Sequence, residues 1–317
     1  METTWELIAG GIWLLAIICV VASLVRLGLR SRGGTLLAPV IWAVVATMFV
    51  CGVELVGLTN GGSDAAWLPA VRFIAAVSTL CPAIALLGAK RPQSRAWQFI
   101  VLTLFGILVQ PAIVALLLHY GEPVTLHAAR QWFLAVLMLI GVINYLPTRY
   151  ALSGVLVCAA QILLLWGHLP FTEFADGRAL AGVERVGAES WREWLPGLLL
   201  IAAVAIPQLG WPRGKSSVAP WDQLWIDFRN AYGIVWALRL GERLNATLAA
   251  SGQSARLGWH GFECAALASS SEKIESTAKS SPPESAAAAP DEAARRALVA
   301  LLRRFVSKEW IAARADA

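Results

Sequence analysis

Seven apolar segments, each close to the length of a membrane span, constrain what this 317-residue chain can fold into. A helix needs about 20 mostly apolar residues to cross the hydrocarbon core of a bilayer. The segments therefore predict an all-α fold, a polytopic membrane helical bundle with seven spans. The expected spans are 7–25, 36–58, 67–88, 97–119, 131–147, 150–168 and 195–212.

The composition agrees with a membrane protein and excludes several other classes. Hydrophobic residues make up 57% of the chain and charged residues 15%, whereas soluble domains have about 25% charged residues. The five cysteines form no CxxC pair, so neither a disulfide framework nor a zinc site is predicted. No nucleotide-binding, HExxH, kinase or nucleophile-elbow motif is present. We therefore expect no cofactor, and the sequence leans away from an enzyme.

The distribution of Lys and Arg between the loops predicts the topology. Basic residues gather in alternate loops, which are cytoplasmic under the positive-inside rule. We therefore expect a protein of the cell (inner) membrane, with its N-terminus outside and its C-terminus in the cytoplasm. Topology alone accounts for these residues, and an alternative is that they bind anionic lipid headgroups or another phosphate-bearing partner. The residues are Arg26, Arg30 and Arg32 in the first loop and Lys90, Arg91 and Arg95 in the third.

Two charged residues, Glu54 and Arg72, fall inside predicted spans, where charge is rare. Both lie at similar depth near the outer surface, and each ends a stripe of small residues that lets helices approach closely. A structural ion pair is the first interpretation, and a proton- or ion-handling carboxylate is the alternative. Gln110 and Gln161 lie near mid-depth. We expect an interhelical hydrogen bond between these two amides, with a substrate contact as the alternative.

Three histidines, His119, His127 and His168, map to the outer surface and are candidates for contact with an external ligand. None lies at mid-span, which excludes a transmembrane haem held by two histidines. Together with Glu122, Glu173 and Asp176 they could bind a metal, but their spacing matches no ligand pattern, so no metal is predicted.

The chain changes character after the seventh span. Residues 1–215 are expected to form the seven-span domain, and residues 216–267 a cytoplasmic amphipathic helix with a short extended stretch. Residues 268–290 read as a disordered linker, because their Ser, Ala and Pro cannot form a core. Residues 291–317 read as a basic amphipathic helix that lies on the inner leaflet or folds back on the helix 221–250.

The sequence supports three functions of different classes. The first is a non-enzymatic scaffold or subunit of a larger membrane assembly, with the lipid bilayer and protein partners of the C-terminal tail as its contacts and no nucleic acid. The alternative is a seven-span sensor or small-solute transporter. The third, with no supporting constellation of residues, is a lipid- or quinone-acting membrane enzyme.

Overall fold

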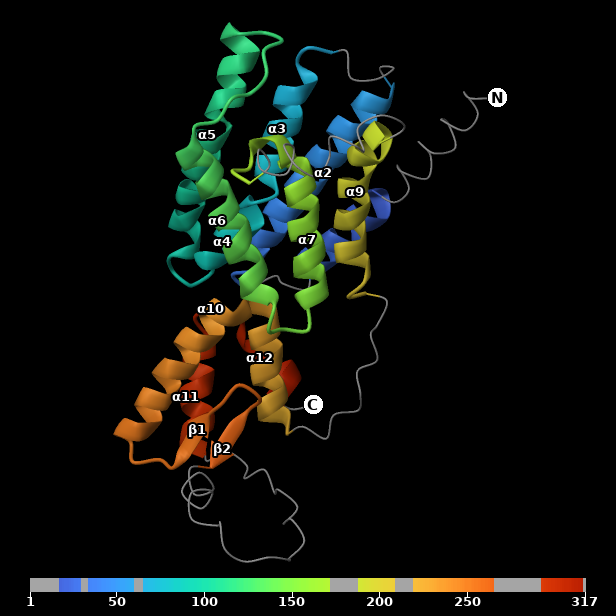
Figure 1. Cartoon of the computed structure of the whole chain (residues 1–317). Coiled ribbons are helices and arrows are strands. Elements are labelled where there is room, and N and C mark those ends of the chain that lie inside the picture. The colour runs from blue at the N-terminus through green and yellow to red at the C-terminus, as the bar shows by residue number, and fades with distance from the viewer. Residues whose placement is uncertain are drawn as a thin grey trace, which may run out of the picture. The chain divides into compact units, whose positions relative to one another are not determined.

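A computed structural model describes residues 17–29, 34–59, 65–171, 188–208, 219–264 and 292–315. The chain divides into two compact units, which we call unit 1 (Met1–Pro212) and unit 2 (Arg213–Ala317). Nearly every element described is a helix (Figure 1). The predicted all-α class is therefore confirmed, with one short β-hairpin in unit 2.

Unit 1 consists of helices joined by short connections. The α6–α7 connection is short, and the two helices pack on each other as a helical hairpin. The described elements are the helix Ile17–Leu29, α2 (Leu37–Thr59), α3 (Leu68–Ser78), α4 (Cys81–Leu87), α5 (Ser94–Leu118), α6 (Ala128–Tyr145), α7 (Ala151–Leu164), η1 (Trp166–His168) and α9 (Ala188–Ala205).

Within the described residues, four helical stretches are long and apolar enough to cross a membrane. They are Leu37–Gly57, Leu68–Leu87, Ser94–Leu118 and Ala128–Tyr145. The other three apolar helices are shorter, at Ile17–Leu29, Ala151–Leu164 and Leu195–Ala205. The seven-span prediction is therefore only partly supported. Residues 7–16 of the first predicted span lie outside the described part, and the sixth span changes from α-helix to 3₁₀ helix after Leu164.

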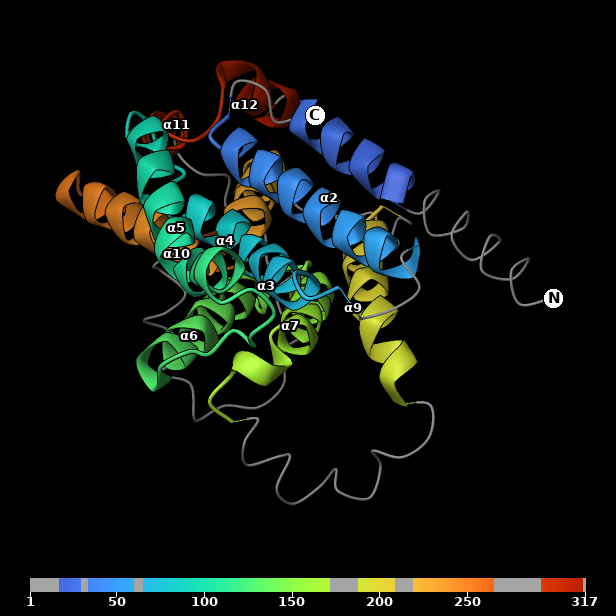
Figure 2. The ribbon, with the colours of Figure 1, turned by 90° about the horizontal axis from the view of Figure 1, so that it is seen from above.

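The pair α3 and α4 forms the centre of unit 1. It contacts α2, α5, α6 and α7, while α9 packs on α7 and α2. Figure 2 shows this arrangement, with the central pair surrounded by the other helices. About two thirds of the window Leu68–Leu87 is buried, against 22% for α6. The central pair thus contributes more side chains to the main core than any other element of unit 1.

The central span is broken between its two helices. Pro82 cannot donate the backbone N–H that would continue α3 through Ser78, so α3 ends and α4 begins at Cys81. The N–H groups of Thr79 and Leu80 instead bond three residues back, to the carbonyls of Ala76 and Val77, both at 3.1 Å. Such a break leaves some carbonyls in need of a partner from another element.

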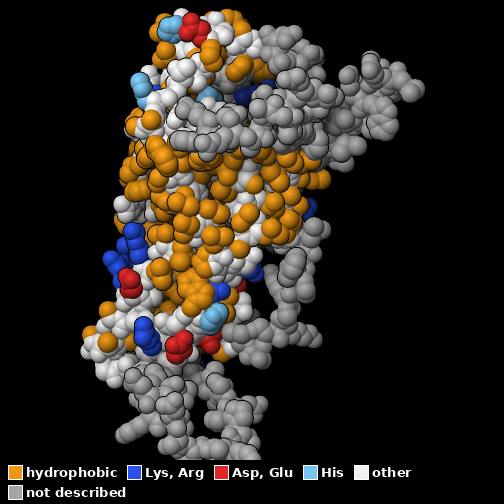
Figure 3. Space-filling model, in the orientation of Figure 1, with side chains coloured by type: hydrophobic (Ala, Val, Ile, Leu, Met, Phe, Trp, Pro, Cys, Tyr) orange, Lys and Arg blue, Asp and Glu red, His pale blue; other side chains and the backbone are white. Residues whose placement is uncertain are grey.

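The surface of unit 1 is apolar over a broad belt, which Figure 3 shows on one face. Side chains of α5 and α6 that point outward are large and hydrophobic, including Phe99, Leu117, Trp132 and Leu139. Exposed apolar area on this scale fits contact with lipid. Unit 1 therefore has the surface of an integral membrane protein.

Unit 2 is built around one long helix. Its elements are α10 (Pro220–Ala250), β1 (Ala255–Leu257), β2 (Phe262–Cys264), α11 (Glu292–Leu302) and α12 (Lys308–Ala315). The strands pair antiparallel, with Arg256 opposite Glu263. Gly233 has φ 77° and ψ −177°, which kinks α10 in its middle. This backbone region is accessible almost only to glycine.

The core of unit 2 is aromatic. Phe305, in the turn after α11, packs edge-on against Phe228, Tyr232 and Trp236 of α10 at centroid distances of 5.0–5.4 Å. The Tyr232 hydroxyl donates to the Phe305 carbonyl oxygen at 3.0 Å. Leu298 and Leu302 of α11 are fully buried. The fold-back on the 221–250 helix, one of the two predicted alternatives, is therefore the arrangement found.

One detail of the predicted tail differs from the structure. The described residues 292–315 form two helices rather than one, because the chain turns at 303–307 and the Ser307 hydroxyl then accepts from the Trp310 N–H at the start of α12. The turn allows Phe305 and Val306 to be buried. The stretch expected to be extended forms the β1–β2 hairpin. The predicted linker 268–290 lies outside the described residues.

Candidate functional site

Glu54 of α2 and Arg72 of α3 form an ion pair, with Arg72 Nη2 3.1 Å from Glu54 Oε2. The Glu54 side chain is 8% exposed and that of Arg72 26%. α2 and α3 pack closely along this contact. The two charged residues that the sequence places inside spans are thus brought together by the fold.

Gly57 makes room for this ion pair. A Cβ atom at Gly57 would lie 3.1 Å from Arg72 Nη2, so a larger residue there would press on the guanidinium. The pair lies at the end of unit 1 where α2 ends and α3 begins. A carboxylate bonded to a guanidinium at this distance forms a charge-assisted contact, and this one joins two helices.

Gln161 of α7 bonds to the break in the central span. Its side-chain Nε2 donates to the backbone carbonyl of Thr79 at 3.0 Å, and both residues are buried. The hydroxyls of Ser78 and Thr79 donate to the carbonyls of Ala75 and Ala76, each at 2.6 Å. Gln161 therefore ties α7 to the break and satisfies a carbonyl there.

The predicted hydrogen bond between Gln110 and Gln161 does not form. The Gln110 side chain is exposed, and its Oε1 accepts from Arg130 Nη2 of α6 at 2.7 Å. The two glutamines thus bond to different elements, Gln110 to α6 and Gln161 to the central span. Depth follows from the position in the sequence, whereas the rotation of each helix about its axis depends on packing, which the sequence leaves open.

The three histidines lie at the same end of unit 1 as Glu54. His119 follows α5 and His127 precedes α6, and both are exposed. His168 is half-buried, with its ring edge-on to Phe73 at a centroid distance of 4.7 Å. No group of three or more His, Cys, Asp and Glu that could hold a metal occurs among the residues described. Glu173 and Asp176 fall outside that part of the chain.

The basic residues lie at the opposite end of unit 1. The Thr35 hydroxyl, just before α2, donates to the Ala89 carbonyl at 2.7 Å, which holds the Lys90–Arg95 segment beside the start of α2. Gly28 packs beside Val40 of α2, so Arg26 lies at the same end. Arg26, Arg91 and Arg95 are exposed, and Lys90 is half-buried. Arg30 and Arg32 lie outside the described residues.

Unit 2 holds polar residues that the sequence analysis does not single out. Asn245 of α10 bonds both backbone groups of Leu257 in β1, as donor at 3.0 Å and as acceptor at 2.7 Å. The Asp222 carboxylate accepts from the Phe262 N–H in β2 at 2.8 Å. These contacts fix the hairpin on α10. The sequence pattern that could have identified these residues is an isolated polar residue on the apolar side of a predicted helix.

Arg229 also fastens the hairpin to α10. Its Nη1 donates to the Trp259 carbonyl at 2.6 Å, and the guanidinium stacks on the Trp259 ring 4.6 Å from the centroid. Burial lowers the pKa of Arg229 from its usual value, but arginine remains charged at neutral pH. The charge is accommodated by stacking and by the carbonyl, so Arg229 has a structural role.

Comparisons with known protein families, with curated proteins and with solved structures found no match to this chain.

Proposed function

We propose that the chain is a seven-span membrane protein that serves as a non-enzymatic subunit of a larger membrane assembly, with unit 2 as its cytoplasmic docking element. The observation that carries the proposal is how the polar side chains inside unit 1 are used. Glu54 bonds to Arg72, and Gln161 bonds to the Thr79 carbonyl. Both contacts join helices to each other, as a structural bundle requires.

The form of unit 2 supports the docking role. It has its own aromatic core, and Asn245, Asp222 and Arg229 hold its hairpin in place. Its surface carries many charges, while unit 1 is covered by apolar side chains. A folded, charged module attached to a membrane bundle is suited to recognise a partner in water.

The two ends of unit 1 support the topology of the proposal. Arg26, Arg91 and Arg95 lie at one end, and Glu54 with the three histidines at the other. Basic residues face the cytoplasm under the positive-inside rule. The basic end is also the end from which α2 and α5 start. This orientation gives an outside N-terminus, and seven spans then give a cytoplasmic C-terminus.

A small-solute transporter is the second candidate, and the break at Thr79–Leu80 favours it. Transporters often bind their substrate where a membrane helix is interrupted near mid-depth. In unit 1 the break is the central element and has Ser78, Thr79 and Gln161 around it. Against this candidate, these side chains all bond to the protein's own carbonyls.

Purification of the full chain in mild detergent tests the proposal. We expect one partner in fixed stoichiometry, measured by light scattering and mass spectrometry. Exposed residues of unit 2 are changed one at a time, for example in the variants Arg243→Glu and Arg256→Glu. Exposed residues of unit 1, such as Phe99→Leu, serve as controls.

Loss of the partner in a unit 2 variant, with the bundle intact, supports the subunit role. A full chain that stays without a stoichiometric partner contradicts it. If such a chain also moves a solute into vesicles, and Gln161→Leu stops the movement, the transporter replaces the subunit as the proposed function.

A further inference from the structure

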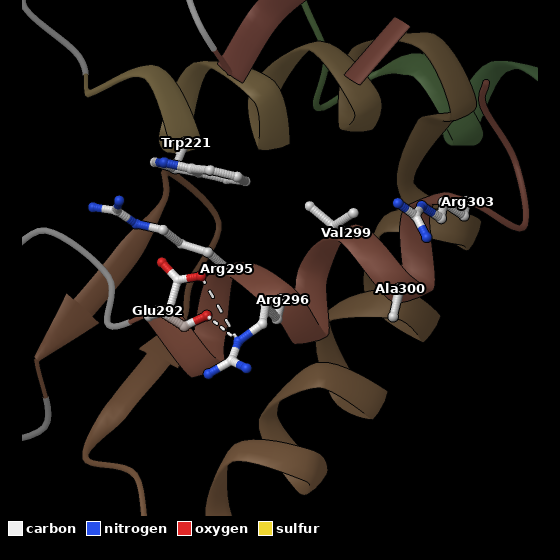
Figure 4. A pocket seen from close by; sticks show the side chains of 7 residues that line it. All are labelled: Trp221, Glu292, Arg295, Arg296, Val299, Ala300 and Arg303. Atoms are coloured by element: carbon white, nitrogen blue, oxygen red, sulfur yellow. Dashed lines mark hydrogen bonds and ion pairs between the residues drawn. The ribbon is translucent and has the colours of Figure 1, made fainter. Parts of the chain in front are cut away.

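A hollow of about 270 Å³ lies in unit 2 between the first turn of α10 and one face of α11 (Figure 4). Trp221 forms one wall, and Val299 and Ala300 line the apolar part. Three arginines, Arg295, Arg296 and Arg303, border the same hollow. An open, partly apolar hollow with this much positive charge is suited to an anion that carries an apolar portion.

Arg295 is held in place without using its hydrogen-bonding capacity. Its guanidinium carbon lies over the Trp221 ring, 5.5 Å from the centroid. Its Nε is buried and has no hydrogen-bond partner among the described residues. A buried donor without a partner is costly, so an acceptor that reaches it gains binding energy. Stacking on Trp221 also reduces the entropy that Arg295 loses when it binds.

Arg296 and Arg303 differ in their present contacts. Arg296 Nε lies 3.8 Å from the Glu292 carboxylate, and both side chains are more than two thirds exposed. An exposed pair of this kind is weak and gives way to a stronger acceptor. No hydrogen bond or ion pair joins the Arg303 side chain to another residue in the described part of the chain. Arg303 is therefore available to an anion, and the Glu292 charge opposes one.

Charge and chain length together indicate which anion reaches the hollow. Residues 292–315 carry six basic residues and two acidic ones. Only residues 206–219 join α9 to α10, and at about 3.5 Å per residue a connection of this length reaches about 50 Å at most. A module tethered so close to a bilayer meets lipid headgroups at high local concentration. Trp side chains also favour the interface between lipid and water.

We propose that this hollow binds the phosphate of an anionic lipid headgroup, with Arg295 as the main contact and with Arg303, on the other side of the hollow (Figure 4), adding positive charge. Trp221, Val299 and Ala300 would contact the glycerol portion. The inference rests on the proposed cytoplasmic position of unit 2. This site differs from the basic end of unit 1, because the ligand is selected by a defined hollow and not only by the attraction of a charged surface.

The test uses the full chain in a neutral detergent, titrated with short-chain phosphatidylglycerol. Hydrogen exchange of the amides in α11 reports occupancy, and the amides of the β1–β2 hairpin report whether unit 2 stays folded. We expect protection of α11 that saturates and that is lost at high salt. Two control titrations are run in parallel, one with short-chain phosphatidylcholine and one with inorganic phosphate. Protection by inorganic phosphate as strong as by phosphatidylglycerol would assign the hollow to a soluble phosphate instead.

Variants distinguish this site from general charge attraction. Each arginine contributes about fivefold in affinity near an anionic lipid, so R295Q/R303Q should bind about 25-fold more weakly. The matched control R243Q/R256Q removes the same charge from exposed positions away from the hollow and should bind as the parent does. Glu292→Gln removes the opposing charge and should bind more tightly.

Equal weakening by the two double variants would overturn the proposal, as would protection by phosphatidylcholine. If R295Q/R303Q loses hairpin protection, the Glu292→Gln result decides: unchanged or weaker binding by this variant contradicts the site. Failure of the subunit proposal appears separately, as the absence of a stoichiometric protein partner. The lipid titration is measured on the purified chain and does not depend on that partner.

Discussion

Single side chains hold unit 1 together where charge would otherwise be costly. Glu54 is almost buried, and its carboxylate is compensated by Arg72, which still reaches solvent with a quarter of its surface. A buried charge without a partner destabilises a protein strongly. A complete ion pair, by contrast, gives about the same stability as an apolar pair of similar volume. The contact therefore matters most for what happens when one member is lost.

We expect Glu54→Leu and Arg72→Leu each to lower stability by about 1–3 kcal/mol, because each leaves the other charge without its ionic partner. The double variant should be more stable than the sum of the two losses predicts. Pulse proteolysis of the full chain in detergent gives the free energies for this double-mutant cycle. Additive losses would show that the two residues do not interact. Retained stability in Glu54→Gln together with loss of a measured activity would instead favour a proton-handling carboxylate.

Gly261 is a second residue on which local structure depends. Its φ is 142°, and a Cβ atom there would overlap the Asp222 carboxyl group that accepts from the Phe262 N–H. We expect Gly261→Ala to lower the stability of unit 2 by about 1–3 kcal/mol, through strain and loss of that hydrogen bond. Hydrogen exchange should rise in β1 and β2. Gly252→Ala is the matched control, since it also has positive φ but open space around it. Equal effects would mean that strain alone accounts for the loss.

At the scale of elements, two helical interruptions in the described part of the chain each have a partner from another element. The central span breaks before Pro82, and Gln161 of α7 bonds to the carbonyl of Thr79. α10 kinks at Gly233, and Phe305 packs on aromatic residues from both sides of the kink. An interruption removes helical hydrogen bonds, so contacts from other elements must compensate for them.

Removing the partner of the first break should weaken unit 1. Gln161→Leu keeps the volume approximately and leaves the Thr79 carbonyl without this donor, which costs about 1–3 kcal/mol. The melting temperature in detergent should fall. The melting temperature of Gln161→Glu should be no higher than that of Gln161→Leu, because an ionised carboxylate cannot donate a hydrogen bond to the Thr79 carbonyl. A melting temperature unchanged in Gln161→Leu would show that another donor or water satisfies the carbonyl.

The kink in α10 is tested by Gly233→Ala. Alanine is disfavoured at φ 77° and ψ −177°, and a straight helix would separate Phe228 or Trp236 from Phe305. We expect a loss of about 1–3 kcal/mol and weaker protection of α11 and α12 from hydrogen exchange. Gly241→Ala, in a regular part of the same helix, should have a smaller effect or a stabilising one. A stabilised Gly233→Ala protein would contradict the kinked core.

The sequence predicts the elements better than their contacts. Apolar runs indicate the helices of unit 1, and small residues beside Glu54 and Arg72 indicate which faces meet. The Gln110 prediction is wrong because the depth of a residue does not determine the rotation of its helix. The kink at Gly233 is missed because one glycine within a helical pattern is usually tolerated. Leu298 and Phe305 follow one apolar stripe, although a turn places them in different segments.

At the scale of the whole molecule, the number of spans decides where the two ends of the chain lie. Seven spans place the N- and C-termini on opposite sides of the membrane, whereas the four long apolar stretches alone would place them on the same side. The shorter helices Ile17–Leu29, Ala151–Leu164 and Leu195–Ala205 make the difference. Their apolar character fits spans that are completed by neighbouring residues.

Reporter fusions separate these two topologies. A reporter that is active only in the cytoplasm should be active after Ala317 and silent before Met1 and at Gly62. A reporter active only outside should give the reverse pattern at each position. The same activity at both termini would contradict seven spans. A cytoplasmic Gly62 would invert the proposed orientation and place unit 2 outside.

The aromatic contact between Phe305 and α10 also has a consequence for how the protein is made. Phe228, Tyr232 and Trp236 leave the ribosome well before Phe305, which covers them. At about 5–20 residues per second, the synthesis of residues 251–305 leaves the rings uncovered for about 3–11 s. During that interval they resemble the exposed surface that chaperones and proteases recognise. A nonsense mutation between α10 and α11 would make this state permanent, so the cell should degrade such a chain even if its membrane bundle is complete.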